Sequence, residues 1–206
     1  MGHWVVFDAM GVVFEVGDDT NDLLVPFVQQ YNDTSRERIN DLYIEASLGR
    51  RTSEQFWREV GLGAYYPDIE TEYLDTRLTV DKDFCSVAER LADRFRLGLL
   101  SNDVPEWSAY LRRRHSLDFF DVVVVSGLVG YRKPDGRIYE IFLKQAKAAP
   151  DSCILVDDRY RNLRTAKALG FKTIHFERTP ADAGDFAPDA CIKSLSELED
   201  RIQRIW

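Results

Sequence analysis

Short, continuously apolar runs alternate with amphipathic segments over most of the chain. The segments between the runs carry hydrophobic residues at helical spacing. The apolar runs cover roughly residues 3–8, 97–100, 122–125, 153–156 and 173–176, and a weaker one covers 190–192. Strands that are apolar on both sides are typical of a parallel sheet whose two faces are covered by helices. The pattern therefore predicts an α/β fold with a Rossmann-like parallel sheet core and right-handed crossovers.

Between about residues 17 and 81 the period is helical and no strand is indicated. Four helices are predicted there, around residues 23–31, 39–46, 52–60 and 69–78. Thr52 and Gln55 form a plausible capping box for the third of them. The block is also acidic, with 14 Asp and Glu against 6 Arg and no Lys, whereas the rest of the chain balances at 21 against 21. We therefore predict two domains, an α/β core of residues 1–16 and 82–206 and a four-helix cap of residues 17–81.

Composition narrows the classes of function. The 206 residues, of which 45% are hydrophobic, are enough for a sizeable buried core. A net charge of −8 argues against a nucleic-acid partner. No apolar run approaches the roughly 18 residues of a membrane span, and the N-terminus lacks a signal-peptide pattern. The three cysteines lack metal-ligand spacing, so we expect reduced thiols in a cytoplasmic protein. Nothing in the sequence predicts an oligomeric state.

Polar side chains stand where the predicted strands end. They are Asp8 after the first strand, Ser101 and Asn102 after the second, Lys133 in the loop after the third, and Asp157 and Asp158 after the fourth. Because the carboxyl ends of parallel strands meet at one edge of the sheet, we expect these groups to share a site. A carboxylate can attack phosphorus, Mg²⁺ prefers carboxylate oxygens, and Lys and hydroxyl donors stabilise a transferred phosphoryl group.

This set of residues resembles the motifs of the haloacid dehalogenase-like (HAD) hydrolase superfamily, in its subgroup with a small helical cap (C1). The resemblance covers essentially the whole chain and follows the family's motif order. It implies hydrolysis of a small phosphate ester through an aspartyl-phosphate at Asp8. It also implies that Lys133 is catalytic and that Ser101 and Asn102 bind the phosphoryl group.

The same resemblance implies a Mg²⁺ cofactor. Its ligands would be Asp8, Asp158, the main-chain carbonyl of Met10 and, often through water, Asp157. The three histidines lie away from the strand ends and are expected to be structural. Aromatic residues of the predicted cap could line a substrate pocket, although we expect most of them to pack the cap helices; they are Trp57, Tyr65, Tyr66 and Tyr73.

Met10 departs from the pattern of phosphatases in this superfamily. Those enzymes usually have a second Asp two residues after the nucleophile, which protonates the leaving group and then activates water. Methionine cannot transfer protons, and general acid–base catalysis is worth about 10²- to 10⁴-fold in rate. We therefore expect a slow phosphatase unless Asp157, Glu15 or a residue of the predicted cap takes over this role.

Two alternatives remain open. Haloacid dehalogenases also lack this Asp, and the sequence around Asp8 and Ser101 resembles theirs, with Arg38 as a candidate cap arginine. The pair Asp157 and Asp158 resembles a Mg²⁺ site instead, which favours the phosphatase. The other alternative is a catalytically impaired HAD-fold protein that binds its ligand without turnover. A phosphonatase is improbable, because the predicted cap contains no lysine.

Overall fold

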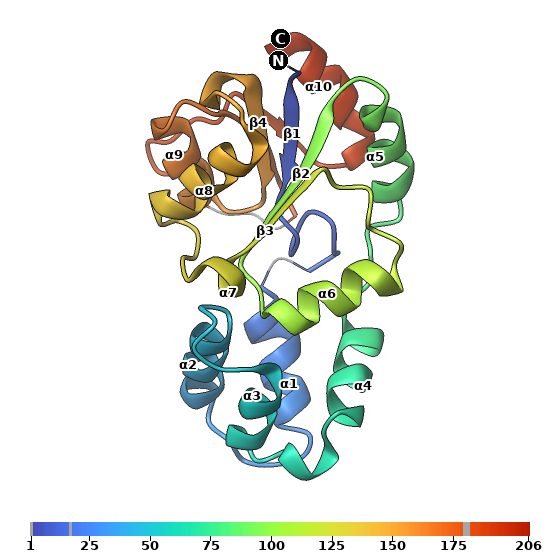
Figure 1. Cartoon of the computed structure of the whole chain (residues 1–206), viewed down its shortest axis with the longest axis vertical. Coiled ribbons are helices and arrows are strands. Elements are labelled where there is room, and N and C mark those ends of the chain that lie inside the picture. The colour runs from blue at the N-terminus through green and yellow to red at the C-terminus, as the bar shows by residue number, and fades with distance from the viewer. Residues whose placement is uncertain (1, 17, 179–181) are drawn as a thin grey trace.

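The computed structural model describes residues 2–16, 18–178 and 182–206, and its centre is one parallel sheet of six strands (Figure 1). The strands are β1 (Trp4–Phe7), β2 (Arg96–Ser101), β3 (Val122–Val125), β4 (Cys153–Asp157), β5 (Lys172–Phe176) and β6 (Ala190–Ile192). They lie in the order β3-β2-β1-β4-β5-β6, and every neighbouring pair is parallel. This confirms the predicted α/β fold and places β1, which leads to Asp8, between β2 and β4.

Helices cover both faces of the sheet (Figure 1). They are α5 (Phe84–Ala92), α6 (Pro105–Arg114), α7 (Ser126–Val129), α8 (Gly136–Ala146), α9 (Tyr160–Ala168) and α10 (Leu198–Ile205). Alternate strand residues face opposite ways, so Val5 and Phe7 pack into a core with α5, α6 and α10, whereas Trp4 and Val6 pack with α8 and α9. Burial on both sides explains why the strands are apolar at almost every position.

A helical segment follows β1, as the sequence predicts. It contains a π-helical turn (Thr20–Leu24) that continues into α1 (Val25–Val28), then α2 (Arg36–Ala46), α3 (Ser53–Glu59), a 3₁₀ turn (Gly63–Tyr65) and α4 (Asp68–Arg77). The predicted capping box of Thr52 and Gln55 is confirmed at the start of α3. None of the helices in the described parts of the chain is long and apolar enough to cross a membrane.

The helical segment sits at the carboxyl edge of the sheet and shares a core with it. Trp107 of α6 packs against aromatic rings of α2, α3 and α4, among them Tyr43 at 5.9 Å and Tyr73 at 5.4 Å between ring centroids. The indole N–H groups of Trp57 and Trp107 both donate to Glu70, at 2.9 and 2.8 Å. Hydrophobic packing therefore continues through Trp107 from the helical segment into the sheet core. The division into two domains stays a prediction.

Candidate active site

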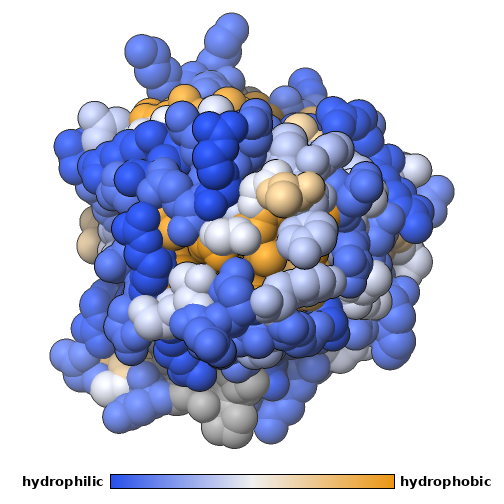
Figure 2. Space-filling view, turned by 90° about the horizontal axis from the view of Figure 1, so that it is seen from below, coloured by the Kyte–Doolittle hydropathy of each residue, from blue (hydrophilic) through white to orange (hydrophobic). Residues whose placement is uncertain are grey.

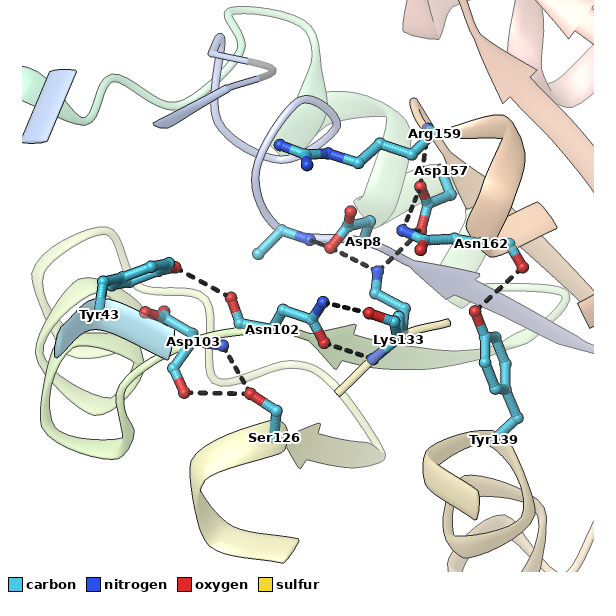
Figure 3. Close-up of polar contacts among 11 residues, drawn as sticks. Asp8, Tyr43, Asn102, Asp103, Ser126, Lys133, Tyr139, Asp157, Arg159 and Asn162 are labelled. Atoms are coloured by element: carbon cyan, nitrogen blue, oxygen red, sulfur yellow. Dashed lines mark hydrogen bonds and ion pairs between the residues drawn. The ribbon is translucent and has the colours of Figure 1, made fainter. Parts of the chain in front are cut away.

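Asp8 follows β1 directly and is held at the middle of the sheet edge (Figure 3). Its N–H donates to the Val156 carbonyl at 2.9 Å, which extends the pairing of β1 with β4 by one residue. Its carboxylate Oδ1 accepts the N–H of Ala9 at 2.7 Å and lies 2.7 Å from the Lys133 ammonium. These contacts hold Oδ1 and orient the carboxylate.

Lys133 bridges two carboxylates from inside the protein. Its Nζ lies 2.7 Å from Asp8 Oδ1 and 2.7 Å from Asp157 Oδ2, and only 1% of its side chain is exposed. The Asn102 side-chain amide makes two hydrogen bonds with the Lys133 backbone. It donates to the carbonyl at 2.9 Å and accepts from the N–H at 2.7 Å (Figure 3). Burial lowers the pKa of Lys133, but the charges of Asp157 and Asp8 outweigh burial and hold the pKa above its ordinary value. The lysine therefore stays charged.

Asp157 uses its whole carboxylate to hold its neighbours. Its Oδ1 accepts the N–H of Arg159 at 2.9 Å, its Oδ2 accepts Lys133, and Asn162 Nδ2 lies 3.0 Å from both oxygens. A carboxylate offers about four acceptor positions, so these contacts occupy it fully. A direct bond from Asp157 to a metal would have to displace one of them, and the contact with Lys133 orients the ammonium group. The predicted contact of Asp157 with a metal through water stays a prediction.

Asp158 is in a different situation. Its Oδ1 is buried, and no hydrogen-bond partner for it exists among the residues that the structure describes. Burial, and then the charges of Asp157 and Asp8, raise its pKa to about 8. Oxygen atoms of Asp8, Asp157 and Asp158 lie within 4.8 Å of one another, which is close enough to share one metal ion. An unpartnered buried carboxylate oxygen beside two other carboxylates is the environment that a bound cation would satisfy.

Gly11 lets this cluster form, and its replacement provides a test. Its φ is +86°, and a Cβ there would lie 2.5 Å from the Asp158 carboxylate. We expect Gly11→Ala to lower the free energy of unfolding by about 2–3 kcal/mol, from left-handed backbone strain plus the displaced carboxylate. Gly130→Ala is the control, because its φ is +76° with nothing within 4 Å of the added Cβ. Equal losses in urea unfolding would show that Asp158 is not displaced.

The two residues that the sequence predicts for phosphoryl binding lie in different settings. Ser101 is fully buried at the end of β2, and its hydroxyl has no partner among the described residues. Asn102 lines a cavity beside Asp8, but its amide is occupied by the Lys133 backbone. The Ser101 hydroxyl is thus buried without a partner among the described residues, and the Asn102 side chain has a supporting position. Their roles toward a phosphoryl group stay predictions.

A cavity of about 380 Å³ opens between Asp8 and the helical segment. Besides Asp8, Met10 and Asn102, it is lined by residues that sequence reasoning did not single out, chiefly Asp18, Asp19, Tyr43, Arg132, Arg159 and Arg161. Arg132 precedes Lys133 and Arg159 follows Asp158 in the sequence. Because arginine is common on protein surfaces, this position alone did not indicate that they line a site. Nothing in the sequence indicated which helix of the segment would face Asp8.

Other candidates from the sequence lie elsewhere. Trp57 and Tyr73 are buried between helices, as expected for packing residues. Tyr65 and Tyr66 line a separate pocket at the far end of the helical segment, an end that Figure 2 shows as mostly hydrophilic with a small hydrophobic area at its centre. Arg38 pairs with Glu59 at 2.9 Å on the surface and does not line the cavity.

His175, on β5, stacks on Tyr160 and contacts the Asp158 main-chain oxygen at 3.0 Å. These contacts are those of a structural residue, as the sequence predicts.

Comparison with known proteins gives consistent results. The family described as haloacid dehalogenase-like hydrolase matches residues 4–170. Acyl-CoA dehydrogenase family member 10 of Mus musculus is 38% identical over 151 residues, which are 73% of this chain and 13% of that protein. Glyceraldehyde 3-phosphate phosphatase of Pyrococcus abyssi is 34% identical over 86 residues, 40% of this chain and 36% of that one. The matches thus span well under two thirds of these relatives.

Solved structures are similar over almost the whole chain. A 2-haloacid dehalogenase from Pseudomonas syringae pv. tomato has a TM-score of 0.73 at 20% identity, with 99% of both chains covered. A HAD-family enzyme from Bacteroides thetaiotaomicron, solved with magnesium and inorganic phosphate, has a TM-score of 0.74 at 15% identity, covering 88% of this chain and 97% of that one. At such identities the likeness shows the fold.

Proposed function

The chain belongs to the haloacid dehalogenase-like hydrolase family, and within it we propose that the protein is a Mg²⁺-dependent phosphatase of a small phosphate ester. The observation that carries this proposal is the unpartnered Asp158 oxygen beside the carboxylate of Asp8. A cation bound there would sit next to the nucleophile, where phosphoryl transfer needs positive charge. The similarity to glyceraldehyde 3-phosphate phosphatase of Pyrococcus abyssi supports the same choice.

Asp8 is the proposed nucleophile. Lys133 and the N–H of Ala9 hold Oδ1, so Oδ2 is the oxygen that attacks phosphorus. The bond from phosphorus to the ester oxygen breaks, and the phosphoryl group is left on Asp8. Water then attacks the same phosphorus and releases phosphate. Lys133 and the Ser101 hydroxyl would stabilise charge on the phosphoryl oxygens, because both are donors at the edge of the sheet that carries Asp8.

The residues present fit a magnesium ion. Asp8, Asp158 and the main-chain carbonyl of Met10 would hold it, and that carbonyl accepts none of the backbone hydrogen bonds between described residues. When bound, Mg²⁺ supplies the positive charge that lets an anionic carboxylate approach an anionic phosphoryl group. Asp157 acts on this site by holding Lys133.

A dehalogenase would use the site differently. Displacement of halide from carbon needs no metal, so it gives no reason for the Asp158 carboxylate beside Asp8. The candidate arginine for binding a haloacid, Arg38, is paired with Glu59 on the surface. The phosphatase therefore explains more of the geometry, and release of halide from a 2-haloacid is the measurement that would favour the other reaction.

Metal binding can be tested through stability without any substrate. Burial raises the pKa of Asp8 to about 7 and that of Asp158 to about 8, against 3.8 for an ordinary aspartate. Between about pH 4 and 8 the folded chain therefore holds protons that the unfolded chain has lost, and the pair's contribution to the free energy of unfolding falls as the pH rises. Mg²⁺ requires the deprotonated carboxylates, so we expect it to raise the melting temperature more at pH 8.5 than at pH 6.

Thermal melts in about 5 mM Mg²⁺ and in EDTA, each at pH 6 and at pH 8.5, measure this difference. Asp158→Asn should remove most of the Mg²⁺ effect, whereas Asp151→Asn, on the exposed surface, should leave it unchanged. A Mg²⁺ effect that is the same at both pH values, or that survives in Asp158→Asn, would contradict the assigned metal site.

The function itself is tested with 4-nitrophenyl phosphate, whose leaving group departs with little protonation and so tolerates Met10. We expect turnover that requires Mg²⁺ and is lost in Asp158→Asn. Turnover unaffected by EDTA would overturn the metal assignment. No phosphate release from this ester or from a panel of small phosphate esters would overturn the phosphatase and leave halide release and binding without turnover to be measured.

A further inference from the structure

Met10 cannot give a proton to a leaving group, so the proposed reaction needs another proton donor in the cavity. Asp157 is unsuited, because its oxygens are occupied by Lys133, Asn162 and the N–H of Arg159. Glu15 is exposed and does not line the cavity. Two carboxyl groups of the helical segment do line it, namely Asp18 and Asp19.

Asp19 differs from Asp18 in burial and in bonding. Asp19 is 8% exposed, and its Oδ2 accepts the Tyr43 hydroxyl at 3.1 Å, which leaves Oδ1 for another contact. Asp18 is half-buried, and both of its oxygens accept from Asn21, from the N–H at 3.1 Å and from the side-chain amide at 3.1 Å. Asp18 therefore serves the local turn, whereas Asp19 is a buried carboxyl group that borders the same cavity as Asp8.

The electrostatic surroundings of Asp19 suit proton transfer. Burial raises its pKa, and this outweighs the opposing effects of Arg159, Tyr43 and Arg132, while the charge of Asp18 adds to the rise. Burial, and then the charge of Asp19, raise the pKa of the buried Asp103 as well. A carboxyl group whose pKa lies above its ordinary value can hold a proton closer to neutral pH and release it to a stronger base.

Asp19 and Asp8 share a cavity and a charged neighbour. The guanidinium of Arg159 extends over Asp8 in Figure 3, and the same guanidinium acts on the pKa of both Asp8 and Asp19. The Tyr43 hydroxyl, besides donating to Asp19, lies 3.3 Å from the Asn102 carbonyl at the end of β2. Asp19 therefore belongs to the wall of the same cavity that Asp8 lines.

We propose that Asp19 is the general acid and base of this enzyme, in place of the residue missing at Met10; the inference rests on the proposed phosphatase. As Asp8 Oδ2 bonds to phosphorus and the ester bond breaks, the Asp19 carboxyl group gives its proton to the departing oxygen, which leaves as an alcohol. The Asp19 carboxylate then takes a proton from the attacking water. The bond between phosphorus and Asp8 breaks, phosphate leaves, and Asp19 is protonated again. One residue serves both steps because the alcohol leaves and the water arrives on the same face of phosphorus.

The test compares a good and a poor leaving group in the native chain and Asp19→Asn. For ethyl phosphate, whose alcohol needs a proton, we expect kcat/KM to fall by about 10²- to 10⁴-fold. For 4-nitrophenyl phosphate we expect the first step to slow less than about tenfold while hydrolysis of the aspartyl-phosphate slows strongly. Nitrophenolate should then appear in a burst equal to the enzyme concentration. Glu15→Gln, the same change on the exposed side of the adjoining loop, is the matched control and should show neither effect.

A rescue experiment separates chemistry from structure. Adding Met10→Asp to Asp19→Asn places a new carboxyl group next to Asp8, and we expect it to restore at least about tenfold of the lost ethyl phosphate activity. A purely structural role of Asp19 would not be rescued. Should Asp19→Asn fail to fold, Tyr43→Phe is the second variant. Loss of its hydrogen bond raises the pKa of Asp19 and should shift the alkaline limb of the ethyl phosphate profile to higher pH.

The outcomes are distinct. Native turnover of ethyl phosphate that survives Asp19→Asn within threefold would overturn the inference while leaving the phosphatase intact. So would equal losses on both esters with no burst and no rescue, or an unshifted profile in Tyr43→Phe. If the native chain releases phosphate from neither ester and from none of the panel of small phosphate esters, the proposed function is wrong and the role of Asp19 falls with it.

Discussion

Asp8→Asn is expected to abolish turnover while making the metal-free protein more stable. The loss of activity should be of the order of 10⁴- to 10⁶-fold, the scale found when a covalent nucleophile is removed from other enzymes. Stability should change the other way, because Asp8, Asp157 and Asp158 crowd three carboxylates around one buried lysine. Burial and the charge of Asp157 oppose ionisation of Asp8 and raise its pKa to about 7, although Lys133 favours it. A neutral side chain at this position removes that conflict.

We expect the free energy of unfolding of Asp8→Asn to rise by about 1–3 kcal/mol at pH 8.5 in EDTA, and by less at pH 6, where Asp8 is already largely protonated. Urea unfolding at both pH values measures the difference. Asp151 is an exposed aspartate in the turn just before β4, and the control variant Asp151→Asn should change neither activity nor stability. Residual turnover above a hundredth of the native rate would exclude Asp8 as the nucleophile. Destabilisation at pH 8.5 would show that its pairing with Lys133 outweighs the crowding.

Lys133→Met is expected to have the largest effect on folding. The side chain is 1% exposed and contacts Asp8 and Asp157 at 2.7 Å each, so its removal leaves two buried carboxylates facing each other without a cation. Breaking a buried ion pair by removing one partner costs about 3–5 kcal/mol. Total stabilities of globular domains are about 5–15 kcal/mol, so the variant should be close to unfolding at pH 8.

The pH dependence identifies the cause. At pH 5.5 the Asp8 carboxyl group, whose pKa is raised to about 7, can hold a proton, so we expect the loss of unfolding free energy to be markedly smaller than at pH 8. Lys144→Met, which makes the same change at an exposed position of α8, should cost less than about 0.5 kcal/mol. A loss below about 1 kcal/mol for Lys133→Met, or one that is equal at both pH values, would contradict the central place given to the lysine.

The chain's own pattern determined the architecture. Apolar runs between amphipathic segments predicted a parallel sheet because such strands are buried on both faces, and parallel strands in turn bring their carboxyl ends to one edge. That rule alone placed Asp8, Lys133 and Asp158 in one neighbourhood, and the structure has them there. The helices of the segment after β1 and the capping box of Thr52 were also readable, because local periodicity and side-chain hydrogen bonds over three residues do not depend on tertiary packing.

What each group does within that neighbourhood was decided by tertiary contacts. Asp157 and Asp158 are adjacent and alike in sequence, yet Asp157 has its oxygens filled by Lys133 and Asn162, whereas Asp158 keeps one oxygen without a partner in the described structure. Asp19 had no distinguishing signal, because its burial and its bond to Tyr43 arise only when α2 packs over the sheet edge. Sequence spacing reports which groups reach a site, but lone pairs, burial and pKa depend on the neighbours that long-range packing brings to each group.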